Sequence, residues 1–213
     1  MDGGPQPFPD RAGAGRALAA ELEHHRGTGA VVIGLARGGV PVAAEVARAL
    51  GLVFDVCVVR KLGLPRRPEL AMGAVARGTL VLNPEVVRAG MVDPATLERV
   101  AAREAETLQR RERTYRAGRD PVALAGRPAI LVDDGMATGS SMLAAIQAVR
   151  EQEAGPVTVG VPVAPAASCR AVARAADEVV CVLTPRAFVA VGRWYEDFAE
   201  VSDEEVERLL REA

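Results

Sequence analysis

The sequence predicts an α/β fold: an open, mainly parallel, twisted sheet with helices on both faces. Short, continuously apolar runs recur along the 213-residue chain, and Ala-rich segments with helical periodicity separate most of them. Strands that are apolar on both sides are typical of a parallel sheet buried between helical layers, and successive parallel strands are joined by right-handed crossovers. The apolar runs lie at 30–35, 53–59, 129–132, 157–163 and 179–183, and the helical patterns at 40–50, 140–153 and 165–176.

The chain is expected to open with a flexible arm, because residues 1–9 contain three prolines and two glycines. Asp10 is a good N-cap residue, and apolar residues recur on one side of the segment after it, so we predict a helix from Asp10 to about Arg26. His24 and His25 would then point about 100° apart. That geometry is poor for a single metal ion, and we expect no metal site built by the protein alone.

A segment in the middle of the chain interrupts the alternation. Two short apolar strands, at 70–76 and 79–83, precede two Asx-Pro pairs, each typical of a helix start. The second pair predicts a long helix from Pro94 to about Arg116, with its arginines on a solvated face; a catalytic arm or a docking module for another protein is the alternative. The apolar positions are Leu97, Val100, Ala101, Leu108 and Tyr115, and the arginines are Arg99, Arg103, Arg110, Arg111, Arg113 and Arg116.

The tail of the chain is rich in aromatic residues. Four of the seven aromatic side chains lie between positions 188 and 198, and Ser202 with Glu205 forms a capping box that predicts a last helix. We therefore expect one domain over residues 10–213, with an insertion at about 84–120 and a small C-terminal hood at about 185–213.

Charge and hydropathy exclude several classes of protein. The balance of 26 Lys+Arg against 28 Asp+Glu gives no electrostatic reason to expect duplex nucleic acid or an anionic membrane as partner. The longest uncharged stretch, 154–169, holds three prolines and is too short to span a bilayer, and no secretion signal is recognised. We expect a cytoplasmic protein whose three cysteines, Cys57, Cys169 and Cys181, are buried thiols.

The strongest motif, residues 129–150, joins an apolar strand to Asp133-Asp134, a loop of small residues and a helix. Ligands of open parallel sheets bind beyond the carboxyl ends of strands. Small residues let backbone N–H groups approach a phosphate at the positive helix N-terminus, and ionised carboxylates accept hydrogen bonds from the two ribose hydroxyls. We therefore expect a ribose 5-phosphate here. The predicted 5-phosphate loop consists of Ala137, Thr138, Gly139, Ser140 and Ser141.

A second motif follows the first predicted parallel strand. Arg37-Gly38-Gly39 ends that strand, and Pro41 lies in the first turn of the next helix, where its missing N–H costs little. Glycines at the carboxyl end of a strand allow close approach of a ligand.

Both motifs resemble one family. VDDGMATGSS, residues 132–141, resembles the diphosphate-sugar signature of the type I phosphoribosyltransferases, and residues 31–51 resemble their pyrophosphate-binding loop. The resemblance covers about residues 28–184. It implies a cis peptide bond at Ala36-Arg37 and pyrophosphate contacts from Ala36, Arg37, Gly38, Gly39 and Lys61.

Lys61 is the only lysine of the chain, and it follows Arg60 at the predicted end of a strand. Every other cationic side chain is Arg, so the compact ammonium group of Lys61 indicates a specific contact with a ligand. The alternative is that Lys61 is an ordinary surface lysine. Some adenine-type members of the family carry a similar Arg-Lys pair near the pyrophosphate. The resemblance thus implies the catalytic set Asp133, Asp134, Arg37 and Lys61.

One position departs from part of the family. Relatives that salvage 6-oxopurines usually carry an acid directly before the Thr-Gly pair, and this chain has Ala137 there. The substitution argues against hypoxanthine or guanine salvage by that mechanism. Adenine- and orotate-type members also lack the acid, so its absence from this chain does not argue against catalysis.

The resemblance implies transfer of 5-phosphoribose from phosphoribosyl diphosphate to a nitrogenous base, or the reverse pyrophosphorolysis, through an oxocarbenium-like transition state. Mg²⁺ would arrive with the diphosphate and be held mainly by substrate oxygens, with Asp133 and Asp134 as the nearest protein groups. The base would lie against Phe188, Val189 and Trp194, for which packing is the alternative role. A homo-oligomer is compatible with the sequence. The alternative function is a sensor or regulator that binds a phosphoribosyl compound or nucleotide without turnover.

Overall fold

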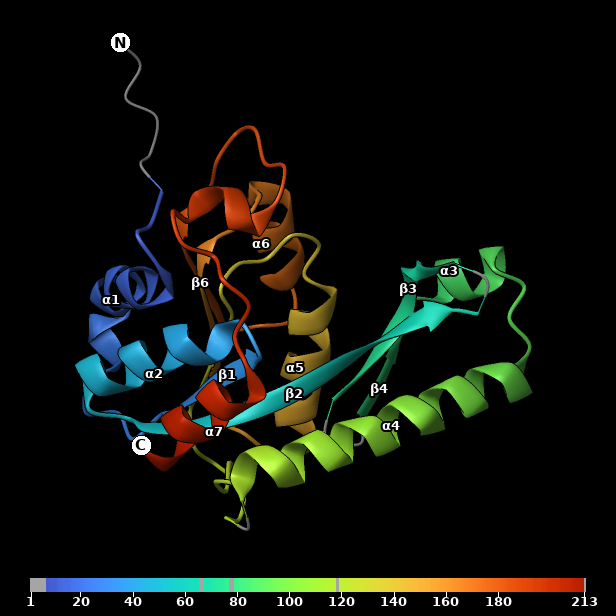
Figure 1. Ribbon diagram of the computed structural model, residues 1–213, viewed down its shortest axis with the longest axis horizontal. Helices are drawn as coiled ribbons and strands as arrows, with labels where there is room; N and C mark the ends of the chain where they lie inside the picture. The colour runs from blue at the N-terminus through green and yellow to red at the C-terminus, as the bar shows by residue number, and fades with distance from the viewer. Residues whose placement is uncertain (1–6, 66, 77–78, 118, 213) are drawn as a thin grey trace.

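The computed structural model describes residues 7–65, 67–76, 79–117 and 119–212. Its strands are β1 (Val31–Ala36), β2 (Val53–Leu64), β3 (Arg67–Ala76), β4 (Thr79–Leu82), β5 (Ala129–Val132), β6 (Val157–Val163) and β7 (Glu178–Leu183). These strands form one seven-stranded sheet in the order β4-β3-β2-β1-β5-β6-β7 (Figure 1). Neighbours from β2 across to β7 pair in parallel, and β3 and β4 are antiparallel additions at one edge. The predicted open, mainly parallel sheet is therefore confirmed.

Helices cover both faces of the parallel strands. The helices are α1 (Arg11–Glu21), α2 (Gly39–Leu50), α3 (Pro84–Ala89), α4 (Pro94–Arg116), α5 (Ser140–Glu151), α6 (Ala166–Val172) and α7 (Asp203–Arg211), with 3-10 turns η1 (Glu23–His25) and η2 (Val191–Trp194). In β1, Val32 belongs to the core cluster of α1, α2 and α7, whereas its neighbours Val31 and Ile33 belong to the cluster of α5. This alternation explains why the strands are apolar at every position.

β2 is longer than predicted and changes neighbours along its length. Residues 53–58 pair in parallel with β1, and residues 59–64 pair in an antiparallel way with β3. Lys61, predicted at the end of a strand, therefore lies inside β2, opposite Ala74. The apolar run stops at Arg60, but main-chain pairing with β3 continues the strand beyond it.

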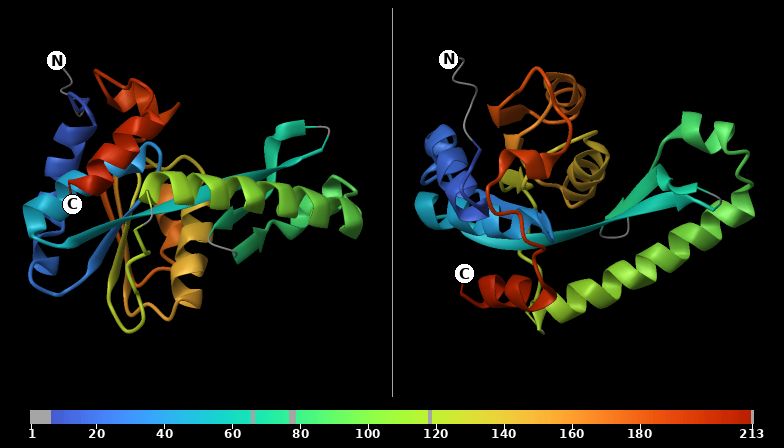
Figure 2. Two further views of the ribbon diagram at one scale, coloured as in Figure 1. Left: turned by 60° about the horizontal axis from the view of Figure 1, so that its bottom comes forward. Right: turned by 45° about the horizontal axis from the view of Figure 1, so that its top comes forward.

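The second half of β2, with β3, β4, α3 and the first half of α4, projects from the sheet; we call these elements the arm (Figure 2). A small cluster of Leu62, Leu64 and Met72 fills the space between its strands and helices, and Leu97 of α4 packs against this cluster. From the arm, α4 runs back to contact α7, and Leu108 joins the main core. The apolar side predicted for α4 is therefore confirmed.

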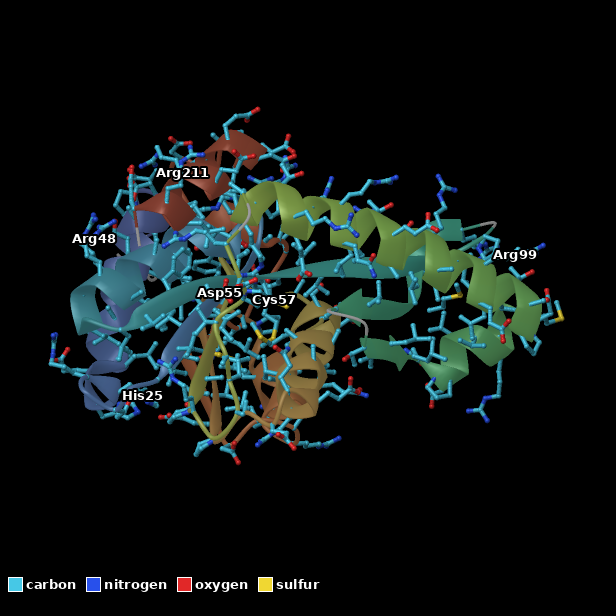
Figure 3. The ribbon with its side chains drawn as sticks, turned by 90° about the horizontal axis from the view of Figure 1, so that it is seen from below. His25, Arg48, Asp55, Cys57, Arg99 and Arg211 are labelled. Carbon is cyan, nitrogen blue, oxygen red and sulfur yellow. A yellow bond between two sulfur atoms is a disulfide. The ribbon has the colours of Figure 1, made fainter. Side chains whose placement is uncertain are left out.

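Arg116 departs from the solvated face predicted for the α4 arginines. It is 8% exposed, and its guanidinium donates to both carboxylate oxygens of Asp55, at 2.7 and 3.2 Å, and to the carbonyl of Val56 at 3.0 Å. Figure 3 shows Asp55 on β2 near the middle of the molecule, whereas Arg99 lies far out along α4. The buried pair thus ties the end of α4 to the sheet. Arg99, Arg103, Arg110 and Arg113 are exposed, as predicted.

α1 ends earlier than predicted. It stops at Glu21, and the N–H of Leu22 is shared between two carbonyls of the preceding turn, which tightens the chain into η1. His24 and His25 lie on this 3-10 turn, and both rings contact Glu178. The expectation that the two rings would diverge was therefore wrong.

The cysteine expectation was wrong in part. Cys169 at α6 and Cys181 in β7 form a disulfide, whereas Cys57 is a buried thiol on β2. The spacing of the cysteines did not reveal the pair, because the helix and the strand that carry it meet only in the fold. α6 is also shorter than predicted and ends at Val172. Over the described ranges, no helix is both long and apolar enough to cross a membrane.

The start of the described chain is held by the tail. Residues 1–6 of the predicted flexible arm lie outside the described residues. Phe8 is 8% exposed, its N–H donates to the carbonyl of Trp194 at 2.8 Å, and its carbonyl accepts from Glu196 at 2.8 Å. Its ring lies 5.6 Å from that of Tyr195, centroid to centroid. The first described residues therefore pack against residues 194–196 of the tail.

Candidate functional site

The glycine loop and the acidic loop meet at one edge of the sheet. β1 and β5 are parallel neighbours, so the loops that follow them leave the sheet on the same side. A Cβ atom added to Gly39 would lie 2.6 Å from the carbonyl oxygen of Val132 and 2.7 Å from the Cα of Asp133. A Cβ on Gly38 would lie 2.7 Å from the Cγ of Asp134. Only glycines allow the two loops to approach this closely.

Asp133 and Asp134 form a half-buried acid pair. The N–H of Asp134 donates to Asp133 Oδ1 at 2.9 Å. Burial, and then the charge of Asp134, raise the pKa of Asp133 well above its usual range, against the opposing effects of the N–H donor and the cations Lys61 and Arg11. Burial also raises the pKa of Asp134, although Arg11 opposes the shift. Both shifts come mainly from burial, so a ligand that brings hydroxyl donors or a cation would stabilise the ionised forms of the pair.

Arg11 is a site residue that the sequence analysis missed. Its Nε and Nη2 each lie 2.9 Å from Asp134 Oδ2, and its Nη1 donates to the carbonyl of Ala199 at 2.7 Å. The guanidinium carbon lies 4.0 Å from the ring centre of Phe198. Only 12% of its side chain is exposed. No local pattern distinguishes Arg11 from the exposed Arg16 on the same helix, so only the fold reveals its role.

The tail lies directly against the acidic loop. The hydroxyl of Tyr195 donates to the backbone carbonyl of Asp134. Burial, and then the charge of Asp134, raise the pKa of Tyr195, so its hydroxyl stays a donor. A Cβ on Gly135 would lie 2.5 Å from Cγ1 of Val191. Tyr195 is thus a second site residue that was missed, although it lies in the aromatic segment that the sequence singled out.

The predicted 5-phosphate loop leads into the first turn of α5. Gly139, with φ of 82°, occupies the N-cap position of this helix. Thr138 Oγ1 lies 3.1 Å from Ser140 Oγ, and the hydroxyl of Ser168 donates to the carbonyl of Ala137 at 2.5 Å. The loop therefore presents hydroxyls and the N–H groups of a helix start beside the acid pair, a combination suited to an anion.

The two predicted pyrophosphate cations differ in their surroundings. Arg37 follows a cis Ala36-Arg37 peptide bond, as the resemblance implied. Its guanidinium pairs with Glu200 and lies 3.6 Å from Asp203, both in the tail. Lys61 is exposed on the arm side of the site, and its charge acts on Asp133. These tail acids were not predicted as partners of Arg37.

The three predicted base contacts lie in the tail in different environments. Phe188 is half-buried, and Val189 is 83% exposed. Trp194 packs against the cluster of Phe8 and Tyr195. Its Nε1 is buried and has no hydrogen-bond partner among the described residues.

A large hollow lies away from this chemistry. It has a volume of about 800 Å³ and lies beside Asp55 and Arg116, at the ends of α2 and α4. A hollow of about 230 Å³ lies between Arg11, Pro41 and Glu200, next to the acid pair. The chemistry of the side chains, rather than the size of the hollow, identifies the candidate site.

Comparison with known proteins identifies the family of the chain. Residues 8–196 match the family model described as the phosphoribosyl transferase domain. The chain belongs to this family. The phosphoribosyl transferase domain is 48% identical over 207 residues to a Mycobacterium tuberculosis H37Rv protein, Rv0571c, whose name assigns it provisionally as a phosphoribosyl transferase. The alignment covers 97% of the chain and 47% of that protein, so the chain spans about half the length of the curated relatives it matches.

Solved structures give the same family fold. The phosphoribosyl transferase domain is 47% identical to TT1426 from Thermus thermophilus, with a TM-score of 0.84 over 97% of this chain and 99% of that one. A purine phosphoribosyltransferase from Pyrococcus horikoshii has a TM-score of 0.50 at 15% identity, covering 90% and 93% of the two chains. At that identity, the second likeness concerns the fold alone.

Proposed function

We propose that this phosphoribosyl transferase domain transfers 5-phosphoribose from phosphoribosyl diphosphate to a nitrogenous base, or catalyses the reverse pyrophosphorolysis. The observation that carries the proposal is the meeting of three features at one sheet edge: the acid pair Asp133-Asp134, the glycine loop 37–39 and the hydroxyl-rich loop 137–141. A diol, a leaving diphosphate and a terminal phosphate are the three groups that such a site would hold.

The loop 137–141 would bind the 5-phosphate. Backbone N–H groups at the start of α5 and the hydroxyls of Thr138, Ser140 and Ser141 supply donors. A hydrogen bond to a charged group contributes about 1.5–3 kcal/mol, so a few of them suffice without a cation in the loop. The leaving pyrophosphate would lie against the N–H groups of Gly38 and Gly39, with Arg37 and Lys61 as its cations.

The acid pair would hold the ribose hydroxyls and stabilise the positive charge that develops on the ribose ring as pyrophosphate departs. Its two members are not equivalent, because Arg11 engages Asp134 while no described cation pairs directly with Asp133. Asp133 is therefore the carboxylate better placed to respond to ligand charge.

Mg²⁺ fits this donor set. Carboxylate oxygens are ligands that Mg²⁺ accepts, and a bound cation would stabilise the ionised forms of Asp133 and Asp134, whose pKa values are raised mainly by burial. Asp133 and Asp134 would hold the ion together with diphosphate oxygens and waters. When bound, the ion would neutralise the charge of the leaving diphosphate.

The acceptor base would lie against the tail, near Phe188, Val189 and Trp194. The indole N–H of Trp194, buried without a partner among the described residues, supports this proposal, because such a donor favours a ligand that supplies an acceptor. The proposed partners are thus two small molecules, the diphosphate sugar and a nucleobase.

The test is release of pyrophosphate from phosphoribosyl diphosphate and Mg²⁺ in the presence of a panel of nucleobases. We expect turnover with at least one base, and a loss of roughly a hundredfold or more in the double variant Asp133→Asn, Asp134→Asn. Glu196→Gln, an exposed tail carboxylate, is the matched control and should keep wild-type turnover. Wild-type turnover in the double variant would contradict the site assignment.

A ligand sensor is the second candidate function. The observation that favours it is the pairing of Arg37 with Glu200 and Asp203, which engages a predicted pyrophosphate cation within the protein itself. Tight nucleotide binding without pyrophosphate release for any base would support the sensor over the enzyme.

A further inference from the structure

The two histidines of the chain converge on one carboxylate, far from the acid pair. His24 Nε2 lies 3.1 and 3.2 Å from the two carboxylate oxygens of Glu178, and His25 Nε2 lies 3.0 Å from Oε2. The cluster lies at the amino ends of β6 and β7, whereas the acid pair follows the carboxyl end of β5. Because these strands are parallel, the histidine–glutamate cluster and the acid pair lie at opposite ends of the strands. Figure 3 shows His25 on the side of the molecule away from the arm.

We propose that His24, His25 and Glu178 form a binding site for one divalent transition-metal ion of the zinc class. The ligand atoms of all three residues lie within 4.8 Å of one another. A tetrahedral ion with bonds of about 2.0–2.1 Å separates its ligand atoms by about 3.3 Å, close to the 3.0–3.2 Å between each ring nitrogen and the carboxylate. His24 is 53% exposed, so its ring has room to rotate onto the ion.

The chemistry of the ligands selects the metal. Two neutral imidazoles and one carboxylate suit Zn²⁺ and its first-row neighbours, whereas Mg²⁺ and Ca²⁺ prefer oxygen ligands alone. Glu178 is 39% exposed, so solvent can reach the fourth position. The site is thus distinct in ligand type from the acid pair, where only oxygens converge.

The carboxylate of the site is held in place by the fold. Thr158 and Glu178 are register partners on β6 and β7, and the Thr158 hydroxyl donates to Glu178 Oε2 at 3.1 Å. This hydroxyl also lies 3.3 Å from His25 Nε2. Asp177, just before Glu178, accepts from the N–H of Val157 at 2.6 Å. A ligand carried on a strand and oriented by a buried hydroxyl is typical of a preorganised metal site.

The consequence of binding is structural. The turn η1 carries both histidines, and β7 is the edge strand of the sheet, so a shared ion joins the end of α1 to that edge. We expect the ion to raise the melting temperature of the domain and to leave phosphoribosyl transfer unchanged.

The test uses the full chain, purified without a histidine tag and stripped of metal by a chelator, and titrated with Zn²⁺ in excess Mg²⁺. We expect one equivalent of Zn²⁺ to bind and to shift the ring nitrogen signals of both histidines in NMR. Because the chain contains only these two histidines, the signals report on this site alone. The titration is repeated in the double variant Asp133→Asn, Asp134→Asn, which removes both carboxylates of the acid pair as competing ligands.

Three variants and one control decide the outcome. His24→Ala, His25→Ala and Glu178→Gln should each weaken Zn²⁺ binding roughly tenfold or more, and Glu196→Gln should not change it. His24 is largely exposed, so His24→Ala keeps the test valid if His25→Ala fails to fold. Wild-type affinity in the three variants, or unshifted histidine signals at saturating Zn²⁺, would overturn the proposal.

Discussion

Arg11 and Asp134 lie 123 positions apart in the sequence and form a nearly buried ion pair at the edge of the acid pair. Two guanidinium nitrogens contact the same carboxylate oxygen at 2.9 Å, and the side chains are only 12% and 13% exposed. The first helix of the domain therefore supplies the cation that opposes the effect of burial on the pKa of a residue just beyond β5. It also anchors the tail, because the same guanidinium donates to Ala199.

Replacing Arg11 by Ala should destabilise the domain and impair the site. The change leaves a buried carboxylate without its cation, which costs about 1–3 kcal/mol in the free energy of unfolding. Urea unfolding at neutral pH measures this loss. Arg16→Ala, an exposed arginine of the same helix, should change the free energy by less than about 0.5 kcal/mol. Equal losses in the two variants would contradict the role assigned to Arg11.

Replacing Asp133 by Asn should stabilise the domain at neutral pH while impairing activity. The raised native pKa means that the ionised form of Asp133 opposes folding, and this penalty grows as the pH rises from the ordinary Asp value of about 3.9 through the native pKa. We expect a gain on the order of 1–2 kcal/mol at neutral pH that disappears near pH 4.

Asp177→Asn is the control, because its expected change in stability at neutral pH has the opposite sign. Its pKa is lowered, above all by the N–H of Val157, so the ionised form favours folding and the variant should be less stable at neutral pH. Unfolding curves at two pH values measure both effects. A neutral-pH loss of stability in Asp133→Asn would show that burial of its charge is not the dominant effect.

Glu200→Gln should strengthen binding of phosphoribosyl diphosphate. Glu200 is 79% exposed and pairs with Arg37, the proposed pyrophosphate cation, so the two anions compete for one guanidinium. Exposed ion pairs contribute about 0.2–1 kcal/mol, which corresponds to a decrease of up to about fivefold in the dissociation constant. Calorimetry measures the constant, with Glu196→Gln as control. Weaker binding in Glu200→Gln would mean that the tail acid assists the ligand rather than competing with it.

Gly38→Ala and Gly39→Ala should distinguish an effect on turnover from an effect on the stability of the domain. The added methyl at position 39 meets backbone atoms of Val132 and Asp133, which cannot move cheaply, and overpacking of this kind costs about 1–3 kcal/mol. At position 38 the atoms nearest to the methyl belong to the side chain of Asp134, not to the backbone, so the clash can be relieved by a shift of that side chain within its pair with Arg11. Gly38→Ala should therefore reduce turnover with a smaller loss of melting temperature than Gly39→Ala, which should reduce both strongly. Identical thermal losses in the two variants would contradict this assignment.

The sequence predicted those parts of the site whose chemistry is local. Asp133, Asp134 and the loop to Ser141 follow one strand and open one helix, so their order alone indicated a phosphate site. The parallel pairing of β1 and β5 then brought Gly38 and Gly39 to the same edge, as an alternating fold requires.

The parts that were missed depend on contacts between distant segments. Arg11 reaches Asp134, and Tyr195 reaches the carbonyl of the same residue, across 123 and 61 positions. The Cys169–Cys181 disulfide depends on the contact between α6 and β7. No periodicity records such contacts, because hydrophobic patterns report which face of an element is buried and not what lies opposite.

The change of partners along β2 has a mechanical consequence. Its first half pairs with β1 of the central sheet, and its second half, with Lys61, belongs to the projecting arm. Asp133 stands on the fixed part of the molecule. A tilt of the arm about the middle of β2 would therefore carry Lys61 toward or away from Asp133 while the acid stayed in place. Because β2 is one continuous strand, a displacement of the arm would change the electrostatic effect of Lys61 on Asp133.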